Sequence, residues 1–123
     1  MRIFLITVLV LNFLFEGAAA TALLLEPEGI NATEMAPGGM WAMNYGFAAL
    51  AIALAIVWIW PQRNNSAVVF AVMGILSTFH ILLTIALAIA GNQMGGMIAH
   101  SIMAVLCIAA LTQRHKWCEP STA

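Results

Sequence analysis

The stretch NNSAVVFAVMGILSTFHILLTIALAIAGNQMGGMIAHSIMAVLCIAALTQ, residues 64–113, contains no Asp, Glu, Lys or Arg. One crossing of a bilayer takes about 20 apolar residues, so this stretch is long enough for two crossings and a tight turn. The pair Gly91–Asn92 inside it is typical of a helix end. A second charge-free stretch, residues 35–62, is long enough for one more crossing. These two charge-free stretches alone predict three membrane-spanning helices.

The composition of the chain points to the same environment. Of the 123 residues, 63 % are apolar and 7 % are charged, whereas a soluble domain carries about a quarter charged residues. Charge this sparse excludes a soluble enzyme and a small secreted disulfide scaffold. Four basic residues and a net charge of −1 also exclude a nucleic-acid-binding surface. The expected environment of the chain is therefore a lipid bilayer.

The apolar runs do not alternate with period two, which favours helices over strands. The predicted fold class is all-α, a polytopic membrane protein built as a four-transmembrane-helix bundle in a single domain. Its second helix is expected to run without a Gly or Pro interruption and to stop at Pro61. The predicted spans are residues 3–25, 40–60, 66–90 and 95–112. The tail that follows them is residues 113–123.

The basic residues predict the orientation of the chain. With four spans, all of them fall on one side of the membrane, and an excess of Lys and Arg marks the cytoplasmic side. Both termini are therefore expected in the cytoplasm, with the chain in a plasma (inner) membrane. These residues are Arg2, Arg63, Arg114 and Lys116.

An alternative interpretation of the N-terminus remains open. Residues 1–20 resemble a signal peptide, with an apolar run followed by the small residues Ala18, Ala19 and Ala20. Cleavage there would leave three spans. The apolar run resumes and continues to Leu25, which favours retention as a full first span.

Titratable groups inside a span are costly and are therefore the first functional candidates. Glu16, His80 and His100 lie inside predicted spans, and Asn44 and Tyr45 lie near the outer end of the second. Counting about 1.5 Å of rise per residue places all five in the outer half of the bilayer. Glu16 and His80 lie at matching depth and could form a hydrogen-bonded or ion pair; if His100 converges with them, the three form a candidate site for protons or a ligand. The alternative is that these groups only link helices; no catalytic residue is predicted.

Metal and haem binding are weaker hypotheses. Met94, Met97 and His100 combine thioether and imidazole ligands, which favour Cu(I), although methionine is also an ordinary apolar filler. Haem ligation by His80 and His100 is disfavoured, because their depths counted along each helix differ by about 7 Å. Two cysteines, eleven residues apart on a helix, are too distant for a disulfide. No bound cofactor is expected, with Cu(I) and a quinone as the alternatives.

The segments LLLEPEG (residues 23–29) and MNYGFAALAIALAI (residues 43–56) resemble the DoxX-like superfamily of small four-helix membrane proteins. Pro27–Glu28 and Tyr45–Gly46 match the layout of that family. The resemblance implies association with membrane redox complexes, including quinone-linked oxidoreductases. Many relatives carry an arginine where this chain has Ala42, so an anion or quinone-headgroup role is not implied for that position.

Three functions follow as hypotheses. The first is a non-catalytic subunit or organiser of a membrane complex, with a membrane-protein partner or a second copy of the chain. The second is a small proton-coupled transporter that uses Glu16 as its carboxylate. The third is a copper or cofactor binder.

Overall fold

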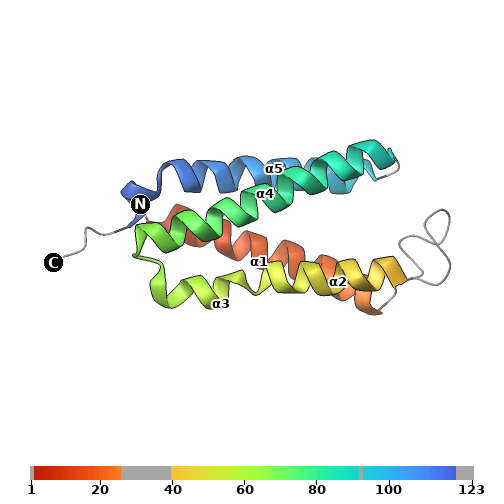
Figure 1. Cartoon of the computed structure of the whole chain (residues 1–123), viewed down its shortest axis with the longest axis horizontal. Coiled ribbons are helices and arrows are strands. Elements are labelled where there is room, and N and C mark those ends of the chain that lie inside the picture. Colours follow the sequence, from red (N-terminus) through yellow and green to blue (C-terminus); the bar gives the residue numbers. More distant parts are fainter. Residues whose placement is uncertain (1, 26–39, 92, 119–123) are drawn as a thin grey trace. The chain divides into compact units, whose positions relative to one another are not determined.

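The computed structural model describes residues 2–25, 40–91 and 93–118. Within these ranges all secondary structure is helical (Figure 1), which confirms the predicted all-α class. The elements in chain order are α1 (Arg2–Leu25), α2 (Met40–Ala53), α3 (Ala55–Ile59), the 3₁₀ turn η1 (Trp60–Gln62), α4 (Ser66–Ala90), α5 (Met94–Thr112) and α6 (Arg114–Trp117).

Four helical stretches are long and apolar enough to cross a membrane, as predicted. They are Ile3–Leu25, Ala42–Gln62, Ser66–Ala90 and Met94–Thr112. The chain is thus a membrane protein with four candidate spans. The segment 26–39, which includes Pro27–Glu28, and the last residues, 119–123, lie outside the described residues. The type of membrane and the side on which the termini lie stay predictions.

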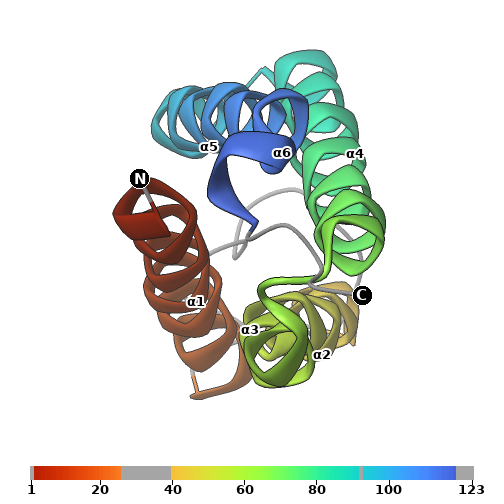
Figure 2. The same cartoon turned by 90° about the vertical axis from the view of Figure 1, so that its left-hand side faces the viewer.

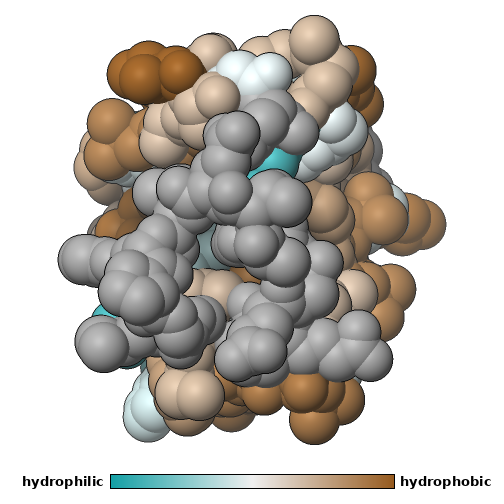
Figure 3. Space-filling model, turned by 90° about the vertical axis from the view of Figure 1, so that its right-hand side faces the viewer, coloured by the Kyte–Doolittle hydropathy of each residue, from teal (hydrophilic) through white to brown (hydrophobic). Residues whose placement is uncertain are grey.

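Many large apolar side chains are exposed on the surface. Ile89, Trp58 and Leu25 are 82 %, 78 % and 76 % exposed. The space-filling view in Figure 3 shows mostly hydrophobic, brown side chains among the coloured residues at its margin. A water-soluble monomer rarely exposes so much contiguous apolar surface, whereas lipid tails contact such a surface without cost.

The chain divides into two compact units. The α1–α2 unit comprises residues 9–57. The α4–α5 unit comprises residues 1–8 and 58–123. Helices α1 and α3 each contribute residues to both units, and each unit is described below by itself.

In the α4–α5 unit the chain makes one helical hairpin. The Asn65 side chain accepts hydrogen bonds from the amides of Ala67 and Val68 and so caps the start of α4. Gly91 ends α4 in the left-handed region, with φ +73°, and its N–H donates to the Leu87 carbonyl. That turn sends the chain back, and α5 lies beside α4 in Figures 1 and 2. The buried apolar residues of these two helices are Val69, Met73, Leu76, Met103, Ala104, Cys107 and Ala110.

In the α1–α2 unit a glycine lets two helices approach closely. A Cβ added at Gly46 would lie 2.9 Å from Leu24 Cγ and 3.2 Å from Leu23 Cβ. Ala42, Ala49 and Ala53 are also buried on α2, at the helical spacing that small residues need to line one face. The packing of α2 against α1 therefore depends on the absence of a side chain at position 46.

The second span departs from the sequence-based prediction at two points. It is interrupted at Leu54, between α2 and α3, although no Gly or Pro stands there. The Val57 amide donates to the Leu54 carbonyl, three residues back, a 3₁₀-type bond. The span also continues past Pro61 to Gln62, because proline is tolerated in the first turn of η1.

Candidate functional site

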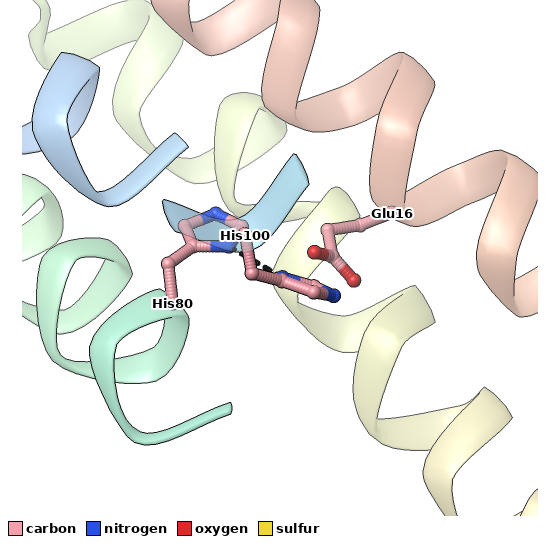
Figure 4. Close-up of side chains that lie close together, drawn as sticks. All are labelled: Glu16, His80 and His100. Atoms are coloured by element: carbon pink, nitrogen blue, oxygen red, sulfur yellow. Dashed lines mark hydrogen bonds between the residues drawn. The ribbon is translucent and has the colours of Figure 1, made fainter. Parts of the chain in front are cut away.

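The α4–α5 hairpin brings His80 and His100 together. The two Nδ1 atoms lie 3.0 Å apart, a hydrogen-bonding distance, and the ring centroids are separated by 5.2 Å. Figure 4 shows the rings and the dashed line between them. His80 is 0 % exposed and His100 is 4 % exposed. Two titratable rings from two helices therefore share one buried hydrogen bond.

The two rings meet although their depths, counted along each helix from its own outer end, differ by about 7 Å. That count assumes that α4 and α5 start level and run parallel, and haem ligation by the two rings stays a disfavoured prediction. The crossing and axial offset of the two helices decide which side chains meet, and these bring His80 against His100.

The geometry of the pair fixes where one proton lies. A neutral imidazole has one N–H donor and one bare nitrogen acceptor. Because the hydrogen bond joins Nδ1 to Nδ1, one ring must carry its proton on Nδ1 while the other presents a bare Nδ1. In the neutral pair the two rings are therefore opposite tautomers, with one proton between the facing nitrogens.

Within the α4–α5 unit, one aromatic ring lies against both histidines. The Phe79 ring makes edge-on contacts with both imidazoles, at centroid distances of 5.3 Å to His80 and 6.2 Å to His100. The Ser77 and Thr84 hydroxyls, one turn before and one turn after His80, bond to their own helix. Ser77 Oγ donates to the Met73 carbonyl and Thr84 Oγ1 donates to the His80 carbonyl. Among the described residues, these hydroxyls thus bond to backbone groups of α4 and not to another helix.

The remaining sequence-based candidates belong to the α1–α2 unit. Glu16 is fully buried on α1, and its expected meeting with His80 stays a prediction. Tyr45 lies within electrostatic range of Glu16, and its hydroxyl is buried without a hydrogen-bond partner among the described residues. Asn44 is exposed. Within this unit Tyr45 is therefore near enough to feel the charge of the predicted carboxyl group, whereas Asn44 lies at the surface.

Sequence reasoning missed the role of Asn12. Its side-chain amide, 1 % exposed, donates to the Ile52 carbonyl over 3.1 Å. In a regular helix that carbonyl accepts the amide four residues on, and here it lies just before the interruption at Leu54. The available signal was a lone carboxamide in an otherwise apolar run, since such side chains hydrogen-bond across helices in membranes.

The residues of the predicted copper site differ in how deeply they are buried. Met94 is 64 % exposed, in contrast to the buried His100. Met97 is half-buried, and copper binding by this set stays a prediction. Cys107 and Cys118 are not joined to each other by a disulfide.

Comparisons of the chain with protein-family models, with curated proteins and with solved structures returned no match. The resemblance to the DoxX-like superfamily therefore stays a prediction.

Proposed function

We propose that this membrane protein handles protons at the His80–His100 pair, as the proton-coupled element of a small transporter or of a larger membrane complex. The observation that carries the proposal is the buried Nδ1–Nδ1 hydrogen bond between two helices. Ionisable residues inside the membrane are rare because they are costly, and they mark ion and proton pathways. Histidine suits this role because its charge changes near neutral pH.

The proton balance of one relay step is simple. A proton arrives at the bare Nε2 of the ring whose Nδ1 carries the shared proton. That ring then passes its Nδ1 proton to the facing Nδ1, and the second ring releases a proton from its own Nε2. One proton enters and one leaves, and the two rings exchange tautomers. The cycle closes when each ring separately takes up a proton at its bare nitrogen and releases the proton of its other nitrogen to the same side, so that no proton passes back between the rings.

Proton flux into liposomes tests the proposal. The purified chain is reconstituted with a pH-sensitive dye inside, and a potassium diffusion potential drives proton entry. We expect flux above that of protein-free liposomes, reduced by at least about tenfold in His80→Gln and in His100→Gln, because general acid–base groups contribute at least this much. Liposomes with the unaltered chain that acidify no faster than empty ones would contradict the proposal.

Two further variants sharpen this measurement. Ser101→Ala is the matched control: it removes a polar group next to His100 whose hydroxyl bonds only to the Met97 carbonyl among the contacts described, and it should leave the flux unchanged. Glu16→Gln tests separately the sequence-based hypothesis that this carboxyl group is the proton-coupled one. If Ser101→Ala and His100→Gln lose equal flux, general damage to α5 explains the loss and the proposal fails.

A second candidate function, a non-catalytic subunit or organiser of a membrane complex, is supported by an open glycine on α4. A Cβ added at Gly74 would meet nothing within 4 Å, and the neighbouring Ala71 and Thr78 are exposed. Small residues at this spacing let another helix pack closely in lipid. Gly74→Leu should then shift the chain to a smaller assembly in native mass spectrometry, while Gly95→Leu, at a second open glycine, should not.

A further inference from the structure

The short helix α6 folds back onto the beginning of α4. Ser66 Oγ and His115 Nδ1 lie 3.3 Å apart, which joins the first residue of α4 to the middle of α6. Cys118 Sγ lies 3.9 Å from the Arg63 carbonyl, just before α4. Figure 2 shows α6 at the end of α5, in the same unit. These contacts make one corner from residues 60–66 and 114–118, which we name the α4–α6 corner.

Two arginines of this corner are held in place by aromatic rings. The Arg63 guanidinium lies 4.9 Å from the centroid of the Trp60 ring and donates from Nη1 to the Trp60 carbonyl. The Arg114 guanidinium lies 4.8 Å from the centroid of the Phe70 ring and donates from Nη1 to the Leu111 carbonyl. A guanidinium has five N–H donors, so these contacts orient each fork and leave most of its donors for another acceptor.

The charge at this corner has no counterpart in the described part of its unit. All acidic residues of the chain except Glu16 lie outside the described residues, and Glu16 belongs to the α1–α2 unit. Arg63 and Arg114 are half-buried, and Lys116 beside them is exposed. Within residues 58–91 and 93–118 this end therefore carries positive charge only.

The position of the corner at the end of the spans indicates what neutralises this charge. Trp58 and Trp60 are 78 % and 42 % exposed, and exposed tryptophans at a span end lie at the level of the lipid headgroups. Guanidinium forks match the oxygens of a phosphate group. Basic pockets between membrane helices recognise anionic headgroups in this way.

We propose that the α4–α6 corner is a binding site for the phosphate of an anionic phospholipid headgroup, held between Arg63 and Arg114. The site is independent of the histidine pair and of the proton-coupled function. It differs from a general attraction of basic residues to an anionic surface in that it needs the guanidinium forks at these two positions. His115 and Ser66 position the site by holding α6 against α4.

Native mass spectrometry of the full chain tests this site. The protein, delipidated in a mild detergent, is titrated with phosphatidylglycerol and, in parallel, with phosphatidylcholine. We expect phosphatidylglycerol to bind more tightly by at least about tenfold, and the variant with both Arg63→Gln and Arg114→Gln to lose this preference. Lys116→Gln, the matched control that removes an exposed charge of the same helix, should change the affinity by less than about twofold.

Three outcomes would overturn the proposal. Equal binding of both lipids would remove the anionic headgroup as the ligand. An equal loss in Lys116→Gln would show general charge attraction. Displacement of the lipid by an equal concentration of inorganic phosphate would show a site for free phosphate. The pair Arg63→Lys and Arg114→Lys keeps the charge and removes the forks, so it should also lose affinity, and an unchanged thermal melt in detergent verifies that each variant is folded.

Discussion

The two units both bury polar side chains between apolar helices, but they satisfy those side chains in different ways. In the α4–α5 unit, His80 bonds to another titratable side chain, His100. In the α1–α2 unit, the amide of Asn12 bonds to a backbone carbonyl, that of Ile52. A carboxamide and a carbonyl keep one arrangement of protons, whereas two imidazoles have two. The first unit thus contains a bond that can change state, and the second contains one that cannot.

The helices of the two units also approach one another differently. At Gly46 the α1–α2 unit has space only for a hydrogen, with leucine carbons 2.9 and 3.2 Å from an added Cβ. At Gly96 in the α4–α5 unit the nearest atom is Leu87 Cδ1, at 3.3 Å, the end of a flexible side chain. The α1–α2 unit is therefore the less tolerant of added volume, and the largest effect is expected there.

Gly46→Leu should destabilise the α1–α2 unit by about 3 kcal/mol, because overpacking at a tight helix contact forces the backbones apart. The measurement is the free energy of unfolding in mixed micelles with increasing dodecyl sulfate. Gly17→Leu, in the same unit, is the control, since its Cβ would meet nothing within 4 Å, and it should change the free energy by less than about 0.5 kcal/mol. Equal losses at both positions would contradict the close approach at Gly46.

Removing one member of the histidine pair should cost less. His100→Leu takes away the Nδ1 partner of His80, and a buried polar group that loses its partner costs about 1–2 kcal/mol. Changing both histidines to leucine removes both polar groups. We therefore expect the loss in the free energy of unfolding of the double variant to be smaller than the sum of the losses of the two single variants. Strict additivity in the same unfolding measurement would show that the two rings are not coupled.

Asn12→Leu should cost about 0.6 kcal/mol, the average worth of a polar contact between membrane helices. It should also make the second span more regular, because the Ile52 carbonyl becomes available to the amide of Ile56. Hydrogen exchange of the backbone amides near Leu54 is the readout, and it should become slower. Unchanged or faster exchange would show that Asn12 does not hold the interruption open.

The positions of the spans could be predicted from the sequence, and the pairing of their polar groups could not. Residues 64–113 carry no charge, so that two helices with a turn at Gly91 follow from length and solvation alone. The meeting of His80 with His100 depends on the crossing and offset of α4 and α5, which no local pattern contains. Both were predicted as site residues, since imidazoles inside a span are costly, and the pairing of His80 with Glu16 stays a prediction.

The helix interruption at Leu54 could not be predicted from the sequence for a related reason. Residues 50–58 contain no Gly or Pro, the signals by which helix breaks are recognised. The group that reaches the backbone there is Asn12, 40 residues earlier in the chain. An interaction between helices, and not the propensity of the residues at the break, accompanies the irregularity.

The smallest effect is expected at Tyr45, where the α1–α2 unit leaves a polar atom unsatisfied within its described part. The hydroxyl is buried without a hydrogen-bond partner among residues 2–25, 40–91 and 93–118, so Tyr45→Phe removes a desolvated group and no bond. The change should leave the free energy of unfolding within about 0.5 kcal/mol of the unaltered chain, or raise it slightly. Asn12→Leu removes a hydrogen bond in the same unit. We therefore expect Asn12→Leu to lower the free energy of unfolding more than Tyr45→Phe does. A larger loss for Tyr45→Phe than for Asn12→Leu would mean that the hydroxyl bonds to a group outside those residues, and that this unit, too, holds a polar contact between two side chains.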